Sequence, residues 1–264
     1  MHRASLSARS ALLVVRTSRP PALAALRPTR GSPSLQPPPW TGMQRRQQYY
    51  RAGEWTRFKK SSGPRPEAVV ASLIAANCLV TMSWYKARQS RRGTNFMLTH
   101  FTTSAQHLAT GRFHTLLTST FSHAEPGHLM ANMFGLYFFG HQICETLGTR
   151  RFLGLYLTSG VLSSLIAVLE QQRTGRHSLN LGASGAVNSI TAMTALLFPH
   201  STFLIFGVLP MPAWLAGSLF ISKDAYAWLT DRRDGIGHVA HLGGALCGGL
   251  YYAHLRRSGI FRRF

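Results

Sequence analysis

The sequence predicts an all-α membrane protein, a bundle of six transmembrane helices preceded by a disordered, basic N-terminal segment. Three observations lead to this fold class. From residue 67 onward the chain contains six apolar stretches of 17–22 residues, Lys, Arg, Asp and Glu all fall outside them, and the first quarter of the chain is polar and strongly basic. The expected spans are residues 68–85, 127–143, 152–169, 179–198, 201–222 and 235–253.

Residues 1–66 have the composition of an organelle presequence. They hold 13 of the 29 Lys and Arg residues of the chain but a single acid, Glu54, and they are rich in Ser and Pro. Mitochondrial and chloroplast presequences share this composition, because the membrane potential draws a cationic segment toward a negative compartment. A basic tail that binds nucleic acid or anionic lipid, or a linker without a function, are the alternatives. We expect residues 1–66 to be presequence and linker, 67–256 the membrane domain and 257–264 a short basic tail.

Each apolar stretch is expected to be a helix. A lipid-exposed segment has to satisfy its own backbone hydrogen bonds, which a helix does, and a charge at the bilayer centre costs several kcal/mol. A soluble all-α protein is the alternative, and a mean hydropathy close to zero is compatible with it. That average, however, combines a polar first quarter with an apolar remainder. No internal repeat is visible, which argues against a transporter built from two related halves.

The fifth stretch contains Pro210 and Pro212. Proline removes a helix hydrogen bond and weakens the segment that contains it. Residues 201–222 are therefore a candidate mobile gate, and a merely kinked structural helix is the alternative.

The three cysteines, Cys78, Cys144 and Cys247, lie within apolar stretches and form no CxxC pair. Neither a disulfide framework nor a thiolate metal site is expected from this pattern. Buried cysteine that packs as a small hydrophobe is the ordinary case.

Polar residues inside membrane spans are functional candidates because they are costly to place there. The first group is Gly182-Ala183-Ser184-Gly185, at the start of the fourth stretch. A serine flanked by glycines can lie where the backbone turns into a helix, with free N–H groups nearby for an oxyanion. The alternative is ordinary helix packing, since small residues line many helix contacts in membranes.

The second group is His238 and His241 in the sixth stretch, followed by Gly244 and Gly248. Residues three apart lie near one face of a helix, and the glycine spacing lets another backbone approach closely. A base on this helix can therefore reach a serine on its neighbour, although a lone membrane histidine is more often a simple helix-to-helix hydrogen bond.

The third group is His128 and Asn132, spaced i and i+4 in the second stretch. This spacing directs the imidazole and the amide to the same side of a helix. Both groups can donate hydrogen bonds, so they suit a developing oxyanion.

Together the three groups supply a nucleophile, a base and oxyanion donors. No Asp or Glu within the stretches is positioned to orient His241, so the sequence predicts a Ser–His dyad rather than a triad. A metal site or channel built on His128, His238 and His241 is an alternative, which the lack of a carboxylate or cysteine among them disfavours.

The sequence resembles the rhomboid family from about residue 67 to residue 256. The matching motifs occur in the family's order: HLMAN with GLYFFG, RFLGLYLTSG, GASG and AHLGGAL. The stretches LLTSTFSH, LGASGA and HVAHLGGALCG are similar to the mitochondrial branch, the presenilin-associated rhomboid-like proteases.

The resemblance implies a six-span intramembrane serine protease with Ser184 as nucleophile and His241 as general base. It also implies an oxyanion hole of His128, Asn132 and the Ser184 backbone N–H. A multi-pass protein of the mitochondrial inner membrane is expected, acting on transmembrane proteins within the lipid bilayer. We expect no cofactor, no metal and no nucleic-acid partner. A non-catalytic rhomboid-like protein that binds membrane helices is the alternative, but such proteins typically lack the serine or the histidine.

Overall fold

The computed structural model describes residues 64–205, 209–232 and 234–259. The chain divides into two units, Met1–Gly53 and Glu54–Phe264, and all the described residues belong to the second. The predicted presequence in residues 1–66 therefore lies almost entirely outside the described residues, as does most of the predicted basic tail in residues 257–264.

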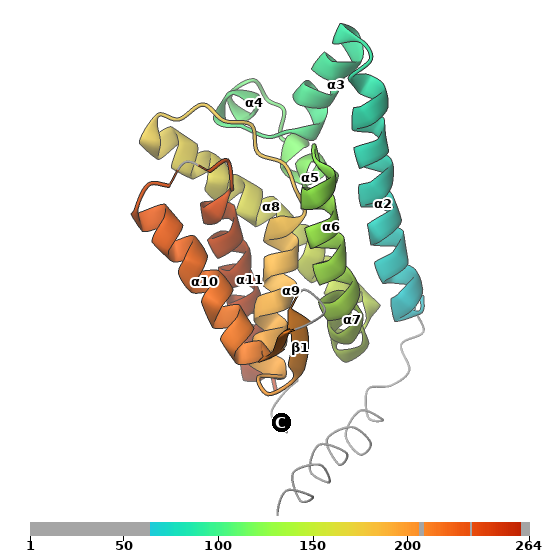
Figure 1. The fold of residues 1–264 in the computed structure, drawn as a ribbon, viewed down its shortest axis with the longest axis vertical. Helices are drawn as coiled ribbons and strands as arrows, with labels where there is room; N and C mark the ends of the chain where they lie inside the picture. The colour runs from blue at the N-terminus through green and yellow to red at the C-terminus, as the bar shows by residue number, and fades with distance from the viewer. Residues whose placement is uncertain (1–63, 206–208, 233, 260–264) are drawn as a thin grey trace, which may run out of the picture. The chain divides into compact units, whose positions relative to one another are not determined.

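The described part of the second unit consists mainly of helices that run side by side (Figure 1). The bundle helices are α2 (Pro66–Ala87), α6 (Pro126–Gly135), the π-helical turn η3 (Leu136–Gly140), α7 (His141–Leu147), α8 (Thr149–Thr174), α9 (Ser184–Leu197), α10 (Ala213–Leu229) and α11 (His238–Arg257). Each of the six predicted stretches contains helix, and the all-α class is confirmed.

Two of these helices, α2 and α8, are long and apolar enough to cross a membrane, judged by length and composition. They have 22 and 26 residues, with mean hydropathies of 1.6 and 2.0 in their most apolar windows. At 1.5 Å per residue they are about 33 and 39 Å long, compared with a hydrocarbon core of about 30 Å.

The connection between α2 and α6 folds against one end of the bundle. It contains α3 (Arg91–Phe101), α4 (Ala105–Ala109), α5 (Thr115–Thr118) and the 3₁₀ turn η2 (Ser119–Phe121), all near the upper end in Figure 1. Two hydrogen bonds fasten its last part to α2. The indole N–H of Trp84 donates to Ser122 Oγ at 2.7 Å, and the Arg88 guanidinium donates to the Ala124 carbonyl at 2.8 Å.

Helix α9 lies in the interior and packs on α8 and most extensively on α11. Its side chains Ala186, Ile190 and Met193 are fully buried in the main apolar core. The polar residue Ser189 is also buried, and its hydroxyl hydrogen-bonds to that of Ser159 on α8 at 2.7 Å. A helix enclosed in this way can carry polar groups that lipid would not tolerate.

The predicted fifth span, residues 201–222, is wrong in its position. Its first half forms an antiparallel pair of short strands, β1 (Thr202–Ile205) and β2 (Leu209–Pro212), with Thr202 opposite Pro212. Pro210 and Pro212 have no backbone N–H, and each disfavours helical backbone at the preceding residue. Helix α10 therefore begins only after Pro212, at Ala213, and continues to Leu229 through residues predicted as a polar loop. The two prolines lie outside this helix, so they do not kink it.

Candidate active site

The turn before α9 places Ser184 at the first position of the helix. Gly182 has a φ of +130°, which favours glycine, and Ala183 caps the helix. The predicted helical stretch from residue 179 thus begins five residues later than expected. Because the first N–H groups of a helix have no carbonyl one turn earlier, the Ser184 N–H is free of an intrahelical partner. The half-buried Ser184 side chain therefore lies beside backbone donors suited to a developing negative charge.

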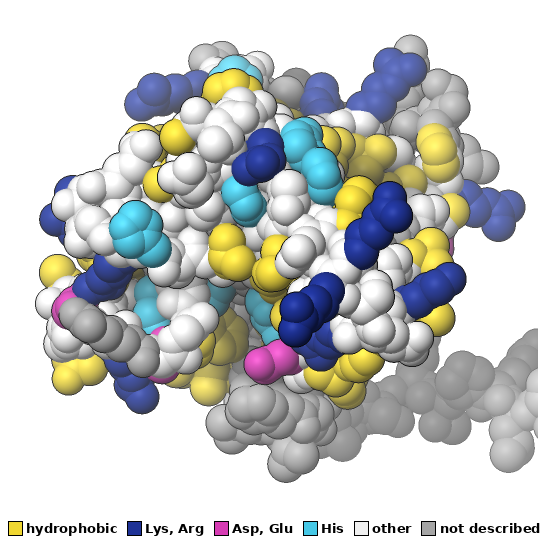
Figure 2. Space-filling model, turned by 90° about the horizontal axis from the view of Figure 1, so that it is seen from above, with side chains coloured by type: hydrophobic (Ala, Val, Ile, Leu, Met, Phe, Trp, Pro, Cys, Tyr) yellow, Lys and Arg dark blue, Asp and Glu magenta, His cyan; other side chains and the backbone are white. Residues whose placement is uncertain are grey.

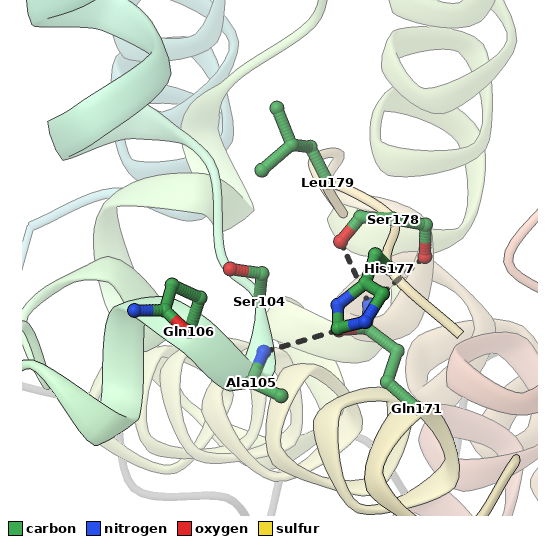
Figure 3. Close-up of a pocket in the computed structure, with 7 residues that line it drawn as sticks. All are labelled: Ser104, Ala105, Gln106, Gln171, His177, Ser178 and Leu179. Carbon is green, nitrogen blue, oxygen red and sulfur yellow. Dashed lines mark hydrogen bonds between the residues drawn. The ribbon is translucent and has the colours of Figure 1, made fainter. Parts of the chain in front are cut away.

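The segment leading to Ser184 is held by backbone and side-chain bonds on three sides. Thr103 and Asn180 exchange backbone hydrogen bonds at 2.8 Å, and the Gly182 N–H donates to the Ser119 carbonyl at 2.9 Å. Gln171 of α8 accepts from the Ala105 N–H at 3.1 Å and donates to Ser178, as Figure 3 shows. Ala105, Gln171 and Ser178 border a cavity of about 210 Å³ near the turn.

His128 and Asn132 come from α6, as predicted from their spacing. The His128 ring lies directly against Gly182, where a Cβ would be 2.5 Å from its Cε1 atom. Any larger residue at position 182 would displace the ring. Asn132 is buried, and its side-chain amide donates to the His128 carbonyl at 2.9 Å. An amide carries two N–H donors, so one remains for another acceptor.

His123 is a further neighbour of this turn. It is fully buried, and its Nε2 accepts a hydrogen bond from the Ala183 N–H at 3.3 Å. Its ring meets that of His128 edge-on, with centroids 5.0 Å apart. Since the Ala183 N–H is occupied, the Ser184 N–H is the next donor along the chain that can face a ligand.

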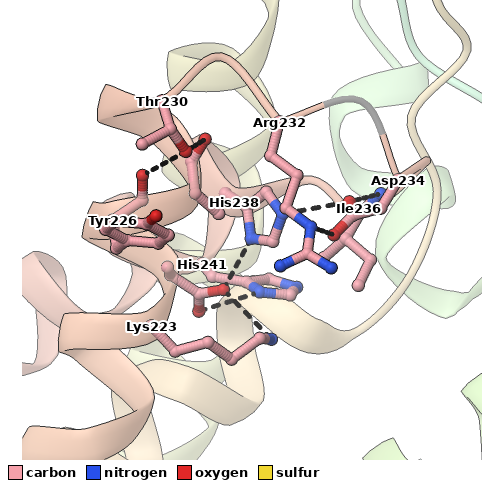
Figure 4. Close-up of polar contacts among 10 residues, drawn as sticks. Lys223, Tyr226, Thr230, Arg232, Asp234, Ile236, His238 and His241 are labelled. Atoms are coloured by element: carbon pink, nitrogen blue, oxygen red, sulfur yellow. Dashed lines mark hydrogen bonds and ion pairs between the residues drawn. The ribbon is translucent and has the colours of Figure 1, made fainter.

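His241 lies on α11 with a carboxylate at its Nδ1 atom. Asp224 Oδ2 is 3.1 Å from His241 Nδ1. Figure 4 shows His241 beside His238 in the same group of polar contacts. The prediction that no acid orients His241 is therefore wrong. Asp224 follows the apolar stretch predicted as the fifth span, but α10 begins later than predicted and carries Asp224 into the bundle, where it is buried.

His238, one turn before His241, contacts two carboxylates. Its Nδ1 is 2.7 Å from Asp224 Oδ1, and its Nε2 is 3.0 Å from Asp234 Oδ1. Asp234 lies in the loop before α11, where it also accepts from the Ile236 N–H and pairs with Arg232. Desolvation raises the pKa of Asp234, but these hydrogen bonds and charges lower it more, so the pKa lies below its ordinary value.

Helices α9 and α11 touch backbone to backbone beside Ser184 and His241. A Cβ on Gly244 would lie 2.0 Å from the Gly185 carbonyl oxygen, and one on Gly248 would lie 2.2 Å from the Ser189 carbonyl oxygen. Among the described residues no hydrogen bond joins Ser184 to His241. Catalytic hydrogen bonds are often long or misaligned without a substrate, so the close helix contact is the relevant observation.

The N-terminal ends of α6, α9 and α11 face the same end of the bundle as the α2–α6 connection (Figure 1). Viewed onto that end, His, Lys and Arg side chains appear at several places on the face (Figure 2). Because His128, Ser184 and His241 lie in the first turns of these three helices, the polar groups of the site lie toward that end of the bundle.

The site and fold define a class: a helical bundle in which an inner helix begins at a serine, and the two helices that contribute imidazoles, α6 and α11, pack against that helix. The chain belongs to the rhomboid family, because the Rhomboid domain model matches residues 110–258. The resemblance predicted from the GASG and AHLGGAL motifs is confirmed.

The curated relatives include organelle proteins of plants and animals. RHOMBOID-like protein 12, mitochondrial, of Arabidopsis thaliana is 35% identical over 208 residues, covering 74% of this chain and 60% of that protein. The human presenilin-associated rhomboid-like protein, mitochondrial, is 33% identical over 193 residues, covering 71% and 49%. Rhomboid-like protein 16, chloroplastic, of Arabidopsis thaliana is 29% identical over 230 residues, covering 79% and 70%. These matches support the mitochondrial branch, and the chain spans about half to six tenths of the first two proteins.

Proposed function

We propose that this chain is an intramembrane serine protease that hydrolyses peptide bonds in or near transmembrane segments of other proteins. The observation that carries the proposal is the backbone contact of α9 and α11 beside Ser184 and His241, with Asp224 on His241 Nδ1. Nucleophilic catalysis needs a serine, a base and a group that orients the base, and these three residues match the three roles.

In this mechanism Ser184 Oγ attacks the scissile carbonyl, and His241 Nε2 takes the hydroxyl proton. When His241 Nδ1–H donates to Asp224 Oδ2, the imidazole is in the tautomer that leaves Nε2 free to accept. His241 then returns the proton to the leaving amine. The ionised Asp224 stabilises the imidazolium between these steps, so we extend the predicted dyad to a Ser–His pair with an orienting aspartate.

The oxyanion of the tetrahedral intermediate is assigned to His128, Asn132 and the Ser184 N–H. His128 lies against the turn that precedes Ser184, and Asn132 keeps one amide N–H beyond its bond within α6. No cofactor takes part in this reaction, and no nucleic-acid partner is proposed.

We further propose that the six helical segments cross the mitochondrial inner membrane. Large apolar side chains are exposed along the outside of the bundle, including Leu79, Phe134, Leu219 and Leu250 from four different helices, which is the pattern that lipid contact requires. Helix α9 has 14 residues, about 21 Å, and is short for a bilayer, but its neighbours enclose it.

The test is a reconstituted full chain with a labelled transmembrane substrate and a fluorophosphonate or isocoumarin probe. Cleavage that persists in a chelator, together with probe attachment mapped to Ser184, supports a serine protease. A folded chain that binds the transmembrane substrate but neither cleaves it nor reacts with the probe would instead be the non-catalytic binding protein.

The presequence proposal is tested by fusing residues 1–66 to a fluorescent reporter. We expect import into mitochondria with removal of at least part of the segment, because nine arginines and no acid precede Glu54. A matched fusion with six of these arginines changed to glutamine should stay in the cytosol. Entry of the unchanged fusion into plastids, or its retention in the cytosol, would contradict the proposal.

His128→Ala and Asn132→Ala should each lower turnover by about 10²-fold with little change in the Michaelis constant. Oxyanion donors act mainly in the transition state, which is why turnover bears the loss. His254→Ala, on the exposed far end of α11, serves as the control and should leave both constants unchanged. The assignment fails for either residue whose replacement raises only the Michaelis constant.

Gly244→Val should lower activity by about a hundredfold, although the side chain touches no reacting atom. Its Cβ meets the Gly185 carbonyl, so α9 and α11 have to separate, and about 1 Å of displacement can cost that much. Gly249→Val on the same helix is the matched control, because nothing lies within 4 Å of a Cβ there. Equal activities in the two variants, measured in membranes with comparable insertion, would refute the packing argument.

A further inference from the structure

Three side chains of the site direct metal-binding atoms toward one another. Asp224 Oδ1 lies 2.7 Å from His238 Nδ1, and its Oδ2 lies 3.1 Å from His241 Nδ1. One ligand atom from each residue lies within 4.8 Å of the other two. Two imidazoles and a carboxylate are ligands that Zn²⁺ prefers, and three protein ligands leave one position for water.

A second carboxylate, that of Asp234, holds the outer nitrogen of His238, as is usual for metal-binding histidines. The Nε2 of His238 hydrogen-bonds to Asp234 Oδ1 at 3.0 Å, so its Nδ1 is the atom turned inward. A histidine ligand almost always donates its second N–H to a carboxylate, carbonyl or water, and that partner fixes the ring. The side chains of Asp224 and His238 are only 7% and 5% exposed, while His241 at 16% leaves access to solvent.

We propose that Asp224, His238 and His241 form a Zn²⁺ site that switches the proposed protease off. Tetrahedral zinc with bonds of about 2.0–2.2 Å holds its ligands roughly 3.3–3.6 Å apart. To admit the ion, the Asp224–His238 contact of 2.7 Å therefore has to open by about 0.6–0.9 Å, and the Asp224–His241 contact of 3.1 Å by about 0.2–0.5 Å. This proposal departs from the expectation of no metal, which depended on the missing carboxylate that Asp224 supplies.

Zinc binding changes which nitrogens of the two histidines carry protons. In the metal-free site Nδ1 of His238 faces Asp224 and its Nε2 faces Asp234. When zinc binds, His238 gives the lone pair of its Nδ1 to the metal, any proton on that nitrogen passes to solvent, and Nε2–H stays on Asp234. His241 gives its Nδ1 lone pair to the metal and carries its single proton on Nε2. That nitrogen then cannot accept the proton of Ser184, which stops the nucleophilic attack. The inhibition rests on the proposed function, whereas zinc binding does not.

A second group of potential ligands provides an internal control. Glu67, His141 and Glu145 also bring ligand atoms within 4.8 Å of one another, near the start of α2 and within α7. Their side chains are 64%, 39% and 54% exposed. Exposed acidic groups of this kind are common on protein surfaces, and we assign no site there.

The first experiment is calorimetric titration of the chelator-treated full chain with Zn²⁺ in detergent micelles. We expect one high-affinity ion per chain, loss of that ion in His238→Gln, and about 10- to 100-fold weaker binding in Asp234→Asn. Glu145→Gln should bind as the unchanged chain does. Asp234→Asn keeps all three ligands, so its zinc affinity tests the proposed site even if His238→Gln fails to fold. Absence of a high-affinity ion, or its loss in Glu145→Gln alone, would overturn the proposal.

The second experiment measures the rate at which a fluorophosphonate labels Ser184 as Zn²⁺ is added. Labelling should slow at the zinc concentration that fills the calorimetric site and recover with chelator, and Asp234→Asn should require about 10- to 100-fold more zinc. A filled site with unchanged labelling would overturn the inhibition. If Ser184 never reacts, the proposed function fails, and calorimetry alone still decides whether the zinc site exists.

Discussion

Replacing Ser184 with alanine is expected to abolish cleavage of a reconstituted transmembrane substrate, while insertion and folding remain unchanged. The substitution removes one hydroxyl from a half-buried position that makes no side-chain hydrogen bond among the described contacts, so packing hardly changes. Without the hydroxyl no acyl-enzyme forms, and loss of a catalytic serine in serine proteases lowers turnover by about 10⁶-fold. Product formation should therefore fall below detection in a quantitative gel or mass-spectrometric assay.

Ser218→Ala is the matched control for this variant. Ser218 lies on the exposed face of α10, and its hydroxyl only bonds back to the Trp214 carbonyl of its own helix. Its replacement should leave cleavage and probe labelling unchanged. Activity of Ser184→Ala within tenfold of the unchanged chain would show that Ser184 is not the nucleophile.

Asp224→Asn is expected to lower turnover by about 10²- to 10⁴-fold with a smaller effect on substrate binding. The buried carboxylate accepts at His241 Nδ1, whereas an amide can turn an N–H toward that nitrogen and favour the wrong tautomer. In serine proteases with a triad, this exchange lowers turnover by about 10⁴-fold. Steady-state kinetics and the rate of probe attachment to Ser184 both report the loss.

Asp231→Asn provides the comparison for the aspartate. Asp231 lies just beyond α10, more than half exposed, and pairs with Arg176. Exposed ion pairs contribute little to stability, so this variant should retain its activity. If Asp224→Asn turns over substrate as fast as Asp231→Asn, the predicted dyad of Ser184 and His241 acts without an orienting acid.

Much of the fold could be predicted because long apolar stretches have few alternatives to helix. The stretches at 68–85, 152–169 and 235–253 lie within α2, α8 and α11 almost entirely. The stretch at 201–222 was predicted less well, because hydropathy does not distinguish an apolar hairpin from an apolar helix. Pro210 and Pro212 carry the signal for a break, although from the sequence they were expected to lie within one span, as part of a mobile gate or of a kinked helix.

In the candidate site, too, residues that share a helix could be predicted from their spacing, whereas contacts between distant segments could not. Spacing alone predicted that His128 and Asn132 share α6 and that His238 and His241 share α11. Asp224 was missed because it lies 17 residues before His241, across a loop, and follows Lys223 in a stretch whose charges favoured solvent exposure. A carboxylate of this kind becomes visible only when α10 is placed against α11. The Ala183 contact of His123 likewise joins residues 60 apart.

The way Asp224 is divided between two histidines has a consequence for the order of kinetic steps. The backbones of α9 and α11 are in direct contact at Gly244 and Gly248, so these two helices cannot move closer together. Beside His238 and His241, α10 contacts α11 through the Asp224 side chain. Outward displacement of α10 would withdraw the carboxylate from both imidazoles, and His241 would lose the group that orients it as the proposed base. In the proposed protease, if a substrate can enter only when α10 moves, substrate entry and peptide-bond hydrolysis therefore have to be two successive steps. A bound polypeptide would be cut only after the helix returns, which gives an unsuitable segment an interval in which to leave intact.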